Sequence, residues 1–267
     1  MVPDWETASV DANGTTLQCY RTGNPDGPPV VLLHGFYDNA ACWTPLVRDL
    51  DSEFDLTLYD ARGHGGSDAP DDGYAMEDRV ADLAGVVEAF DLDSPYLVGH
   101  SMGASTAAWA AATRPGLTRG VVLEDPAGMY NNPDRGPDER AEFVDERVRE
   151  WAEISAAEHA AEYDHLDSDL ADALGRARVQ VRPQIREIAR EGYPHLADAF
   201  PDIDCPALVL RADRETEKRI VDLDMADSLE HGRLVHVPDA GHTILRDEYD
   251  AAYAEIRTFL ERNERSE

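Results

Sequence analysis

The chain has 267 residues, of which 42% are hydrophobic and 30% are charged, and its 55 acidic residues against 24 basic ones give a formal net charge of -31. This length fits one large α/β core with an insertion, and the composition is that of a globular protein. Because the negative charge is spread along the chain, it repels other polyanions and argues against nucleic acid and membrane surfaces as partners.

The positive charge comes almost entirely from arginine, since Lys218 is the only lysine. An acidic, lysine-poor composition resembles that of proteins from halophilic archaea, in which concentrated salt screens the repulsion between like charges. We therefore expect the stability of the fold to rise with salt concentration. The alternative is an ordinary acidic enzyme, whose stability would not rise in this way.

The cysteines and the first residues indicate a cellular compartment. Cys19, Cys42 and Cys205 are far apart and form no C-x-x-C pair, which favours reduced thiols over disulfides or a zinc site. The start of the chain lacks the basic and apolar regions of a secretory signal, and no run approaches the roughly 18 apolar residues of a spanning helix. We expect a cytoplasmic protein; the sequence carries no indication of its oligomeric state.

The predicted elements alternate between strands and helices. Residues 8–11 and 15–20 flank Asn13-Gly14, a dipeptide that favours a tight hairpin turn. The apolar run at residues 30–33 is typical of a parallel strand buried on both faces. Further strands are predicted at residues 55–59, 95–98, 120–123, 207–211 and 234–237, with helical patterns between them such as residues 78–90. This order predicts an α/β fold with a doubly wound, mostly parallel sheet.

One long stretch departs from the alternation. Residues 131–199 open with a loop rich in proline, glycine and aspartate, continue as helical sequence at residues 139–160 and 171–190, and contain no strand candidate. We interpret this stretch as a helical lid inserted into a core formed by residues 1–130 and 200–267. The alternative is that some of these helices belong to the layer that covers the sheet.

The strongest motif is Gly99-His100-Ser101-Met102-Gly103, which lies between an apolar strand and an alanine-rich helical stretch. Glycine on both sides of the serine permits a sharp turn from strand to helix, so the hydroxyl of Ser101 can project from the end of the strand as a nucleophile. The helix that begins there favours negative charge at its N-terminus. The alternative is that the motif forms an ordinary turn, but such a turn would not need a strand before it and a helix after it.

Two further motifs supply groups that a serine nucleophile needs. His34-Gly35-Phe36 follows the first buried strand, where the N–H of Phe36 and that of Met102 could form an oxyanion hole, and His34 itself is expected to shape the loop. Asp239-Ala240-Gly241-His242 follows the last strand, which makes His242 the candidate base among the nine histidines.

In this order the motifs resemble those of the α/β-hydrolase superfamily, over residues 30–260. The resemblance is carried by His34-Gly35-Phe36, Asp60-Ala61-Arg62-Gly63-His64-Gly65-Gly66-Ser67, Gly99-His100-Ser101-Met102-Gly103 and Gly241-His242. In the family the Asp60 to Ser67 loop is mainly structural.

The triad acid departs from the family pattern. The family places an aspartate three residues after a glycine at the end of the strand that corresponds to residues 207–211, but here Ala212 and Glu215 occupy those two places. Asp213 lies closer to the strand end, and some relatives take the acid from the preceding strand, where Asp125 stands. We rank Asp213 first, Glu215 second and Asp125 third.

The resemblance implies a serine hydrolase that cleaves an ester, lactone or thioester through an acyl-enzyme on Ser101, without a metal or organic cofactor. The expected partner is a small acyl substrate, held under the lid where Trp151, Tyr163, Tyr193 and Phe200 are candidate walls. The alternatives are a C–C bond hydrolase, a cofactor-free haloperoxidase-like enzyme, or a non-catalytic binding protein on the same fold.

Overall fold

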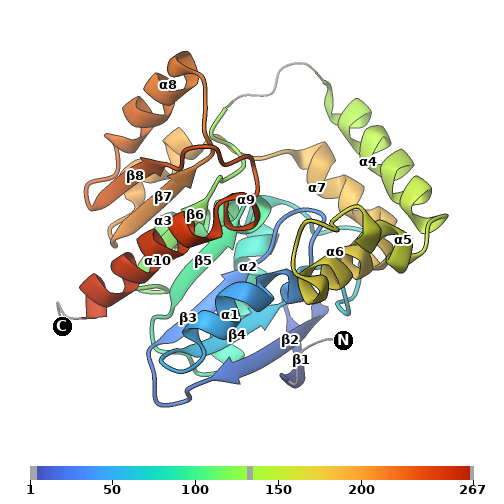
Figure 1. Cartoon of the computed structure of the whole chain (residues 1–267), viewed down its shortest axis with the longest axis horizontal. Helices are drawn as coiled ribbons and strands as arrows, with labels where there is room; N and C mark the ends of the chain where they lie inside the picture. Colours follow the sequence, from blue (N-terminus) through green and yellow to red (C-terminus); the bar gives the residue numbers. More distant parts are fainter. Residues whose placement is uncertain (1–4, 131–134, 265–267) are drawn as a thin grey trace.

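The computed structural model describes residues 5–130 and 135–264. Its centre is an eight-stranded sheet in the order β1-β2-β4-β3-β5-β6-β7-β8 (Figure 1). The strands are β1 (Glu6–Ala12), β2 (Thr15–Gly23), β3 (Pro29–Leu33), β4 (Asp55–Tyr59), β5 (Tyr96–His100), β6 (Gly120–Glu124), β7 (Ala207–Arg211) and β8 (Gly232–His236). The predicted mostly parallel α/β fold is confirmed, since β3 to β8 run parallel and β2 is antiparallel to both of its neighbours, β1 and β4.

The hairpin between β1 and β2 turns where the sequence predicts it. Asn13 and Gly14 have φ angles of 47° and 75°, the positive values that a tight hairpin turn requires. The first four residues of the chain, on which the expectation of an absent signal segment partly rests, lie outside the described residues.

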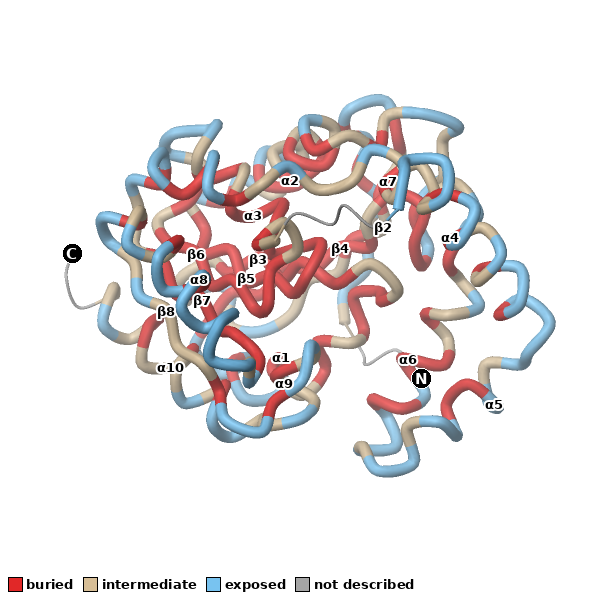
Figure 2. Tube along the Cα trace, turned by 90° about the horizontal axis from the view of Figure 1, so that it is seen from above, coloured by how far each residue is buried: buried red, intermediate tan, exposed pale blue. Residues whose placement is uncertain are grey.

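Helices cover both faces of the sheet because successive strand residues point to opposite sides. Val31 and Leu33 of β3 belong to a core shared with α2 (Met76–Ala89), α3 (Met102–Thr113) and α8 (Thr216–Ala226). Val30 and Leu32 point to the other face, where they belong to a core with α1 (Thr44–Leu50), α9 (Ile244–Asp247) and α10 (Tyr249–Glu264). A short 3-10 helix (Ala40–Trp43) precedes α1. Figure 2 shows the buried strands enclosed between these two layers.

The described part of the chain between β6 and β7 contains helices and loops but no strand. It contains α4 (Pro137–Ala152), α5 (Ala156–Ala161), α6 (Ser168–Gln180) and α7 (Arg186–Glu191), with short 3-10 turns at Pro183–Ile185, Leu196–Asp198 and Phe200–Asp202. Residues 131–134, the first four of the predicted insertion, lie outside the described residues. Figure 1 shows α4 to α7 gathered at one end of the sheet.

Two predicted helices of this segment are each divided. The helix expected at residues 139–160 is interrupted because Ser155 caps a new helix, α5: its side-chain oxygen accepts from the N–H of Glu158. The helix expected at residues 171–190 is interrupted before Pro183, whose ring cannot continue a helix from the preceding turn.

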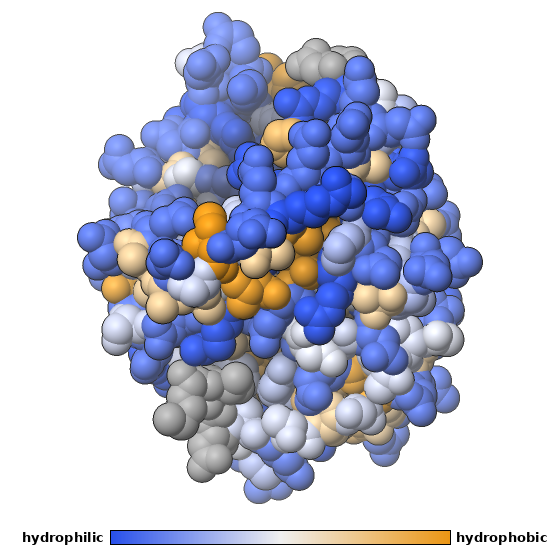
Figure 3. Space-filling model, turned by 90° about the vertical axis from the view of Figure 1, so that its right-hand side faces the viewer, coloured by the Kyte–Doolittle hydropathy of each residue, from blue (hydrophilic) through white to orange (hydrophobic). Residues whose placement is uncertain are grey.

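The helical segment is anchored over the Ser101 turn. Val144 and Val148 of α4 and Ile188 of α7 are buried in one cluster with Met102, the residue that follows Ser101. Figure 3 views the face of the molecule on the side of α4 and α5 and shows a mostly hydrophilic surface with an apolar patch near its middle and smaller apolar areas elsewhere. Within residues 5–130 and 135–264, no helix combines the length and the apolar character needed to cross a membrane.

Candidate active site

Ser101 occupies a strained turn between β5 and α3. Its φ of 49° and ψ of -106° lie in a region that non-glycine residues rarely adopt, and it is 8% exposed. The two flanking glycines are required by close backbone contacts. A Cβ atom on Gly99 would lie 2.5 Å from the nitrogen of Ala104, and one on Gly103 would lie 2.2 Å from the carbonyl oxygen of Leu33.

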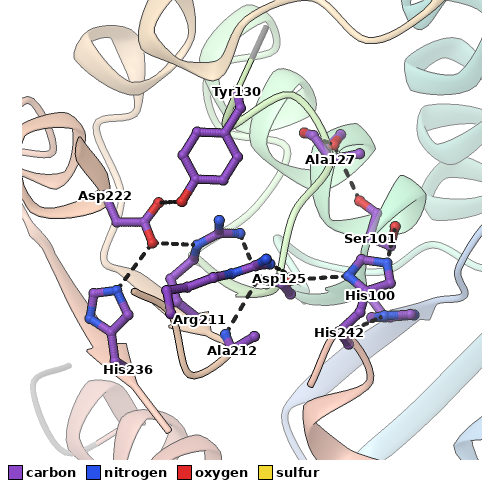
Figure 4. Close-up of polar contacts among 12 residues, drawn as sticks. His100, Ser101, Asp125, Ala127, Tyr130, Arg211, Ala212, Asp222, His236 and His242 are labelled. Atoms are coloured by element: carbon purple, nitrogen blue, oxygen red, sulfur yellow. Dashed lines mark hydrogen bonds and ion pairs between the residues drawn. The ribbon is translucent and has the colours of Figure 1, made fainter. Parts of the chain in front are cut away.

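His242 and Ser101 lie within hydrogen-bonding distance of each other. The Oγ atom of Ser101 is 3.0 Å from Nε2 of His242, and Nδ1 of His242 is 2.6 Å from Oδ2 of Asp125 (Figure 4). A carboxylate can only accept, so Nδ1 of His242 donates to Asp125 and Nε2 is free to accept the serine proton. This is the geometry of a nucleophile, its base and an orienting acid.

The acid in contact with His242 is therefore the candidate that the sequence ranks third. Asp213, ranked first, is exposed, accepts from the backbone N–H of Asp239 at 3.2 Å and pairs with Arg219 at 3.4 Å. Glu215, ranked second, is exposed at the start of α8. Neither is found in contact with His242 among the contacts of the described residues.

The sheet register explains this arrangement. β6 pairs directly with β5, and Glu124 stands opposite His100, so the next residues, Asp125 and Ser101, leave the sheet side by side. The N–H of Ser101 donates to the carbonyl of Glu124 at 2.9 Å, which ties the two turns together. β7, which Asp213 follows, lies one strand further from Ser101.

Two arginines hold Asp125 ionised. Arg211 contacts Oδ1 and Arg214 contacts Oδ2, each at 2.7 Å. Burial favours the neutral acid, but the hydrogen bond from His242 and the two guanidinium groups outweigh it, and the pKa of Asp125 falls to about 2. Asp125 is therefore a carboxylate at neutral pH.

A second carboxylate lies behind this pair. Asp222 is fully buried and contacts Nε of Arg211 at 3.2 Å and Nε2 of His236 at 3.1 Å. It also accepts from the hydroxyl of Tyr130. Figure 4 shows these side chains as one chain of polar contacts from His236 to Ser101. This network was not predicted from the sequence, although an arginine at the end of the otherwise apolar β7 indicates that a buried partner is needed.

The loop that carries His242 is held from the opposite side. Nε2 of His100 is 3.0 Å from the carbonyl oxygen of His242, and Nδ1 of His100 is 3.6 Å from Oδ2 of Asp38. Asp38 also pairs with Arg246 at 2.8 Å. Burial alone would lower the pKa of His100, but the carboxylates of Glu124 and Asp38 raise it above its usual value. These contacts fix the backbone of His242, while its side chain remains 56% exposed.

The arrangement of strand, serine turn and histidine loop agrees with the comparison to known families. The chain matches the alpha/beta hydrolase family over residues 30–256. The chain belongs to this family. As a family member with named hydrolases among its relatives, it is a hydrolase.

Two relatives share 30% identity with this chain over more than two thirds of its length. One is the N-formylmaleamate deformylase of Pseudomonas putida, aligned over 271 residues that cover 95% of this chain and 96% of that protein. The other is the 2-(acetamidomethylene)succinate hydrolase of Mesorhizobium japonicum, aligned over 204 residues that cover 76% of this chain but only 59% of that protein.

Solved structures show the same fold. The crystal structure of E-2-(acetamidomethylene)succinate hydrolase matches with a TM-score of 0.80 at 25% identity, over 96% of this chain and 99% of that one. The enol-lactonase from Burkholderia xenovorans also matches with a TM-score of 0.80, at 24% identity, over 95% of this chain and 99% of that one.

The backbone around the predicted oxyanion hole of this hydrolase is fixed by two buried histidines. Nε2 of His34 accepts from the N–H of Ala61 at 2.9 Å, and Nε2 of His64 is 2.6 Å from the carbonyl oxygen of Phe36. Burial lowers the pKa of His34, and it lowers that of His64 to about 4. Met102 is the first residue of α3, so its N–H has no acceptor within the helix.

A cavity of about 630 Å³ opens beside the hydrolase's serine. Its lining includes Ser101, His242 and Phe36, the residues after β6 up to Tyr130, and Tyr193. Of the other aromatic candidates for its wall, Trp151 and Phe200 are buried in apolar clusters. Within the described residues, no group of three or more His, Cys, Asp or Glu side chains is arranged to hold a metal ion.

Proposed function

We propose that the chain hydrolyses a small acyl compound, an ester, lactone or thioester, through an acyl-enzyme on Ser101. The observation that carries the proposal is the pair of contacts at His242: 3.0 Å from Nε2 to the Ser101 hydroxyl and 2.6 Å from Nδ1 to Asp125. His242 is the general base and Asp125 is the acid that orients it.

In the first step, His242 takes the hydroxyl proton while Oγ of Ser101 attacks the carbonyl carbon. The carbonyl π electrons move to oxygen, and the N–H groups of Phe36 and Met102 stabilise that oxyanion, each contributing roughly 3 kcal/mol. The ionised Asp125 stabilises the imidazolium that forms on His242. The pairs with Arg211 and Arg214 keep Asp125 charged and oriented during this step.

The tetrahedral intermediate then collapses. The bond from the carbonyl carbon to the leaving group breaks, and His242 donates its proton to the departing oxygen or sulfur. Water then attacks the acyl carbon while His242 takes one of its protons. The bond from that carbon to Oγ of Ser101 breaks, His242 returns the proton to Oγ, and the acid product leaves. This sequence consumes one water and needs no redox partner.

The relatives support an acyl substrate of small size. Their names describe a deformylase that acts on N-formylmaleamate, a hydrolase of a substituted succinate and an enol-lactonase. A further structural neighbour, at 24% identity and a TM-score of 0.78, is a thermophilic esterase from Thermogutta terrifontis with malate bound. Because two of the names describe acyl groups on nitrogen, amide-type substrates belong in the first screen.

A fluorophosphonate probe tests the mechanism because it forms a covalent bond only with an activated serine. We expect the probe to label Ser101, and we expect Ser101→Ala to abolish labelling and to lower kcat by roughly 10⁴- to 10⁶-fold. The control is Ser9→Ala, since Ser9 is an exposed residue of the edge strand β1. A folded protein that is not labelled at Ser101, or an activity that survives its removal, refutes the proposal.

A further inference from the structure

The catalytic cavity differs in charge from the rest of the molecule. The chain as a whole has 55 acidic and 24 basic residues. The cavity lining reverses this ratio, because its charged members besides His242 are Arg140, Arg211 and Arg214 against Asp125 and Glu191. A substrate that enters this cavity therefore meets more cationic than anionic groups.

Two of the three arginines already have carboxylate partners. Arg211 is shared between Asp125 and Asp222, and Arg214 pairs with Asp125. These two cations balance these two anions, and both are occupied in holding the acid of the proposed triad. Asp222 is not part of the lining, so Arg140 and Glu191 are the charged lining residues that remain outside these pairs, and Arg140 is the remaining cation.

Arg140 forms none of the ion pairs found among the described residues. Its guanidinium donates to backbone carbonyls instead: Nε to Ala189 at 2.7 Å, Nη2 to Arg190 at 2.8 Å and Nη1 to Arg135 at 3.0 Å. A guanidinium has five N–H donors, so these three bonds leave two without a partner in those contacts. The bonds to the last turn of α7 hold the group rigidly in the cavity wall.

The residues beside Arg140 leave it accessible. Gly192 also lines the cavity, and a Cβ atom at this position would lie 3.2 Å from Nη2 of Arg140, so glycine leaves that face of the guanidinium open. Glu191, the acidic residue of this wall, is exposed. The guanidinium of a further arginine, Arg79, lies 5.0 Å from the ring centroid of the wall residue Tyr193, and Arg79 is only 3% exposed. Like Arg140, Arg79 forms none of the ion pairs found among the described residues, so it is a second positive charge near the cavity without a carboxylate partner there.

We propose that Arg140 is a specificity-determining residue that binds a carboxylate on the substrate, so that the enzyme acts on acyl compounds that carry an anionic group apart from the scissile bond. The inference rests on the proposed acyl hydrolysis at Ser101. A rigid guanidinium with free N–H groups binds a carboxylate through charge-assisted hydrogen bonds, and a neutral substrate leaves those groups without an acceptor.

Matched substrates test the inference. The 4-nitrophenyl monoesters of glutaric and adipic acid carry a free carboxylate, and the corresponding methyl diesters replace it with a neutral group of similar size. We expect kcat/KM of the wild-type enzyme to favour at least one acid over its methyl ester by about 10- to 100-fold. In Arg140→Gln this preference is lost because the value for the acid falls, while the value for the methyl ester changes by less than about 3-fold.

Two further variants keep the test decisive if Arg140→Gln folds poorly. Arg140→Lys retains the charge and should retain most of the preference. Glu191→Gln removes the competing negative charge of the same wall and should increase the preference for the acid by about 2- to 5-fold. Equal effects of Arg140→Gln or of Glu191→Gln on both substrates, loss of the preference in folded Arg140→Lys, or no preference in the wild type overturns the inference. Failure of the proposed function is a different result, because then neither substrate is cleaved and Ser101 is not labelled.

Discussion

Replacing Asp125 by asparagine is the most informative single change, because it distinguishes the two candidate acids. Activity should fall strongly if Asp125 is the acid of the triad, and it should not if Asp213 is. Both carboxylate oxygens of Asp125 are acceptors: Oδ1 for Arg211 and Oδ2 for Arg214 and His242. Asparagine has only one acceptor oxygen, so its NH₂ group must face either a guanidinium or the imidazole. If it faces His242, the ring is held in the tautomer that cannot accept the serine proton.

We expect Asp125→Asn to lower kcat by about 10⁴-fold, the loss found when the wrong histidine tautomer is selected in a serine triad, equivalent to about 5.5 kcal/mol in the activation free energy. The variant also leaves Arg211 and Arg214 without a full counter-charge, which should cost about 3 to 5 kcal/mol in the free energy of unfolding. Denaturant unfolding must therefore accompany the kinetics, so that activity is compared only between folded samples.

Asp213→Asn is the matched control. The side chain of Asp213 is 41% exposed and pairs with an exposed arginine, so the change should alter stability by no more than about 0.5 kcal/mol and leave kcat near the wild-type value. If Asp213→Asn reduced kcat as strongly as Asp125→Asn, or if folded Asp125→Asn retained full activity, the assignment of the acid would be wrong.

Three further predictions follow from the fold and its charge. Gly103→Ala should lose fluorophosphonate labelling and lower Tm, because its Cβ would lie 2.2 Å from the Leu33 carbonyl oxygen, whereas Gly136→Ala, whose Cβ would lie 3.8 Å from Oε2 of Glu139, should do neither. The folded pKa of Asp125 is about 2, below the ordinary 3.8, so its stabilising contribution is fully present above about pH 4 and is lost as the pH falls towards 2. Unfolding measured across this range should show the stability difference between wild type and Asp125→Asn shrinking with acidification, and a difference that stayed constant would contradict the assigned pKa. Finally, a net charge of -31 implies self-repulsion that salt screens, so Tm should rise between low and molar KCl, and an unchanged Tm would refute the halophilic interpretation.

The sequence predicted the parts of the structure that depend on local pattern. The run at residues 30–33 became β3 (Pro29–Leu33), and the strand predicted at residues 95–98 became β5 (Tyr96–His100), because fully buried strands leave a continuous apolar run. The Ser101 turn was predictable for a similar reason. The close approach of β5, α3 and β3 excludes any Cβ at Gly99 and Gly103, and this constraint appears directly in the sequence.

The acid could not be ranked from local pattern because it depends on which strands are neighbours. Asp125, Asp213 and Glu215 all follow buried strands, and only the pairing of β6 with β5 brings Asp125 beside Ser101. The same holds for Arg140, which reaches the cavity through the fold of a helical segment that contains no recognisable motif. In a chain with 55 acidic residues, the presence of a carboxylate at one position does not by itself indicate a functional role.

The position of Asp125 has a consequence for engineering the protein. Asp125 lies at the start of the connection from β6 to α4, and this connection lines the cavity up to Tyr130 before the helical segment begins. The carboxylate that contacts His242 and the helices beside the cavity therefore belong to one continuous stretch of the chain. A chimaera that exchanges the helical segment with that of a relative should join the two sequences after Tyr130, since a junction placed at the end of β6 would replace the turn that carries Asp125 together with the helices.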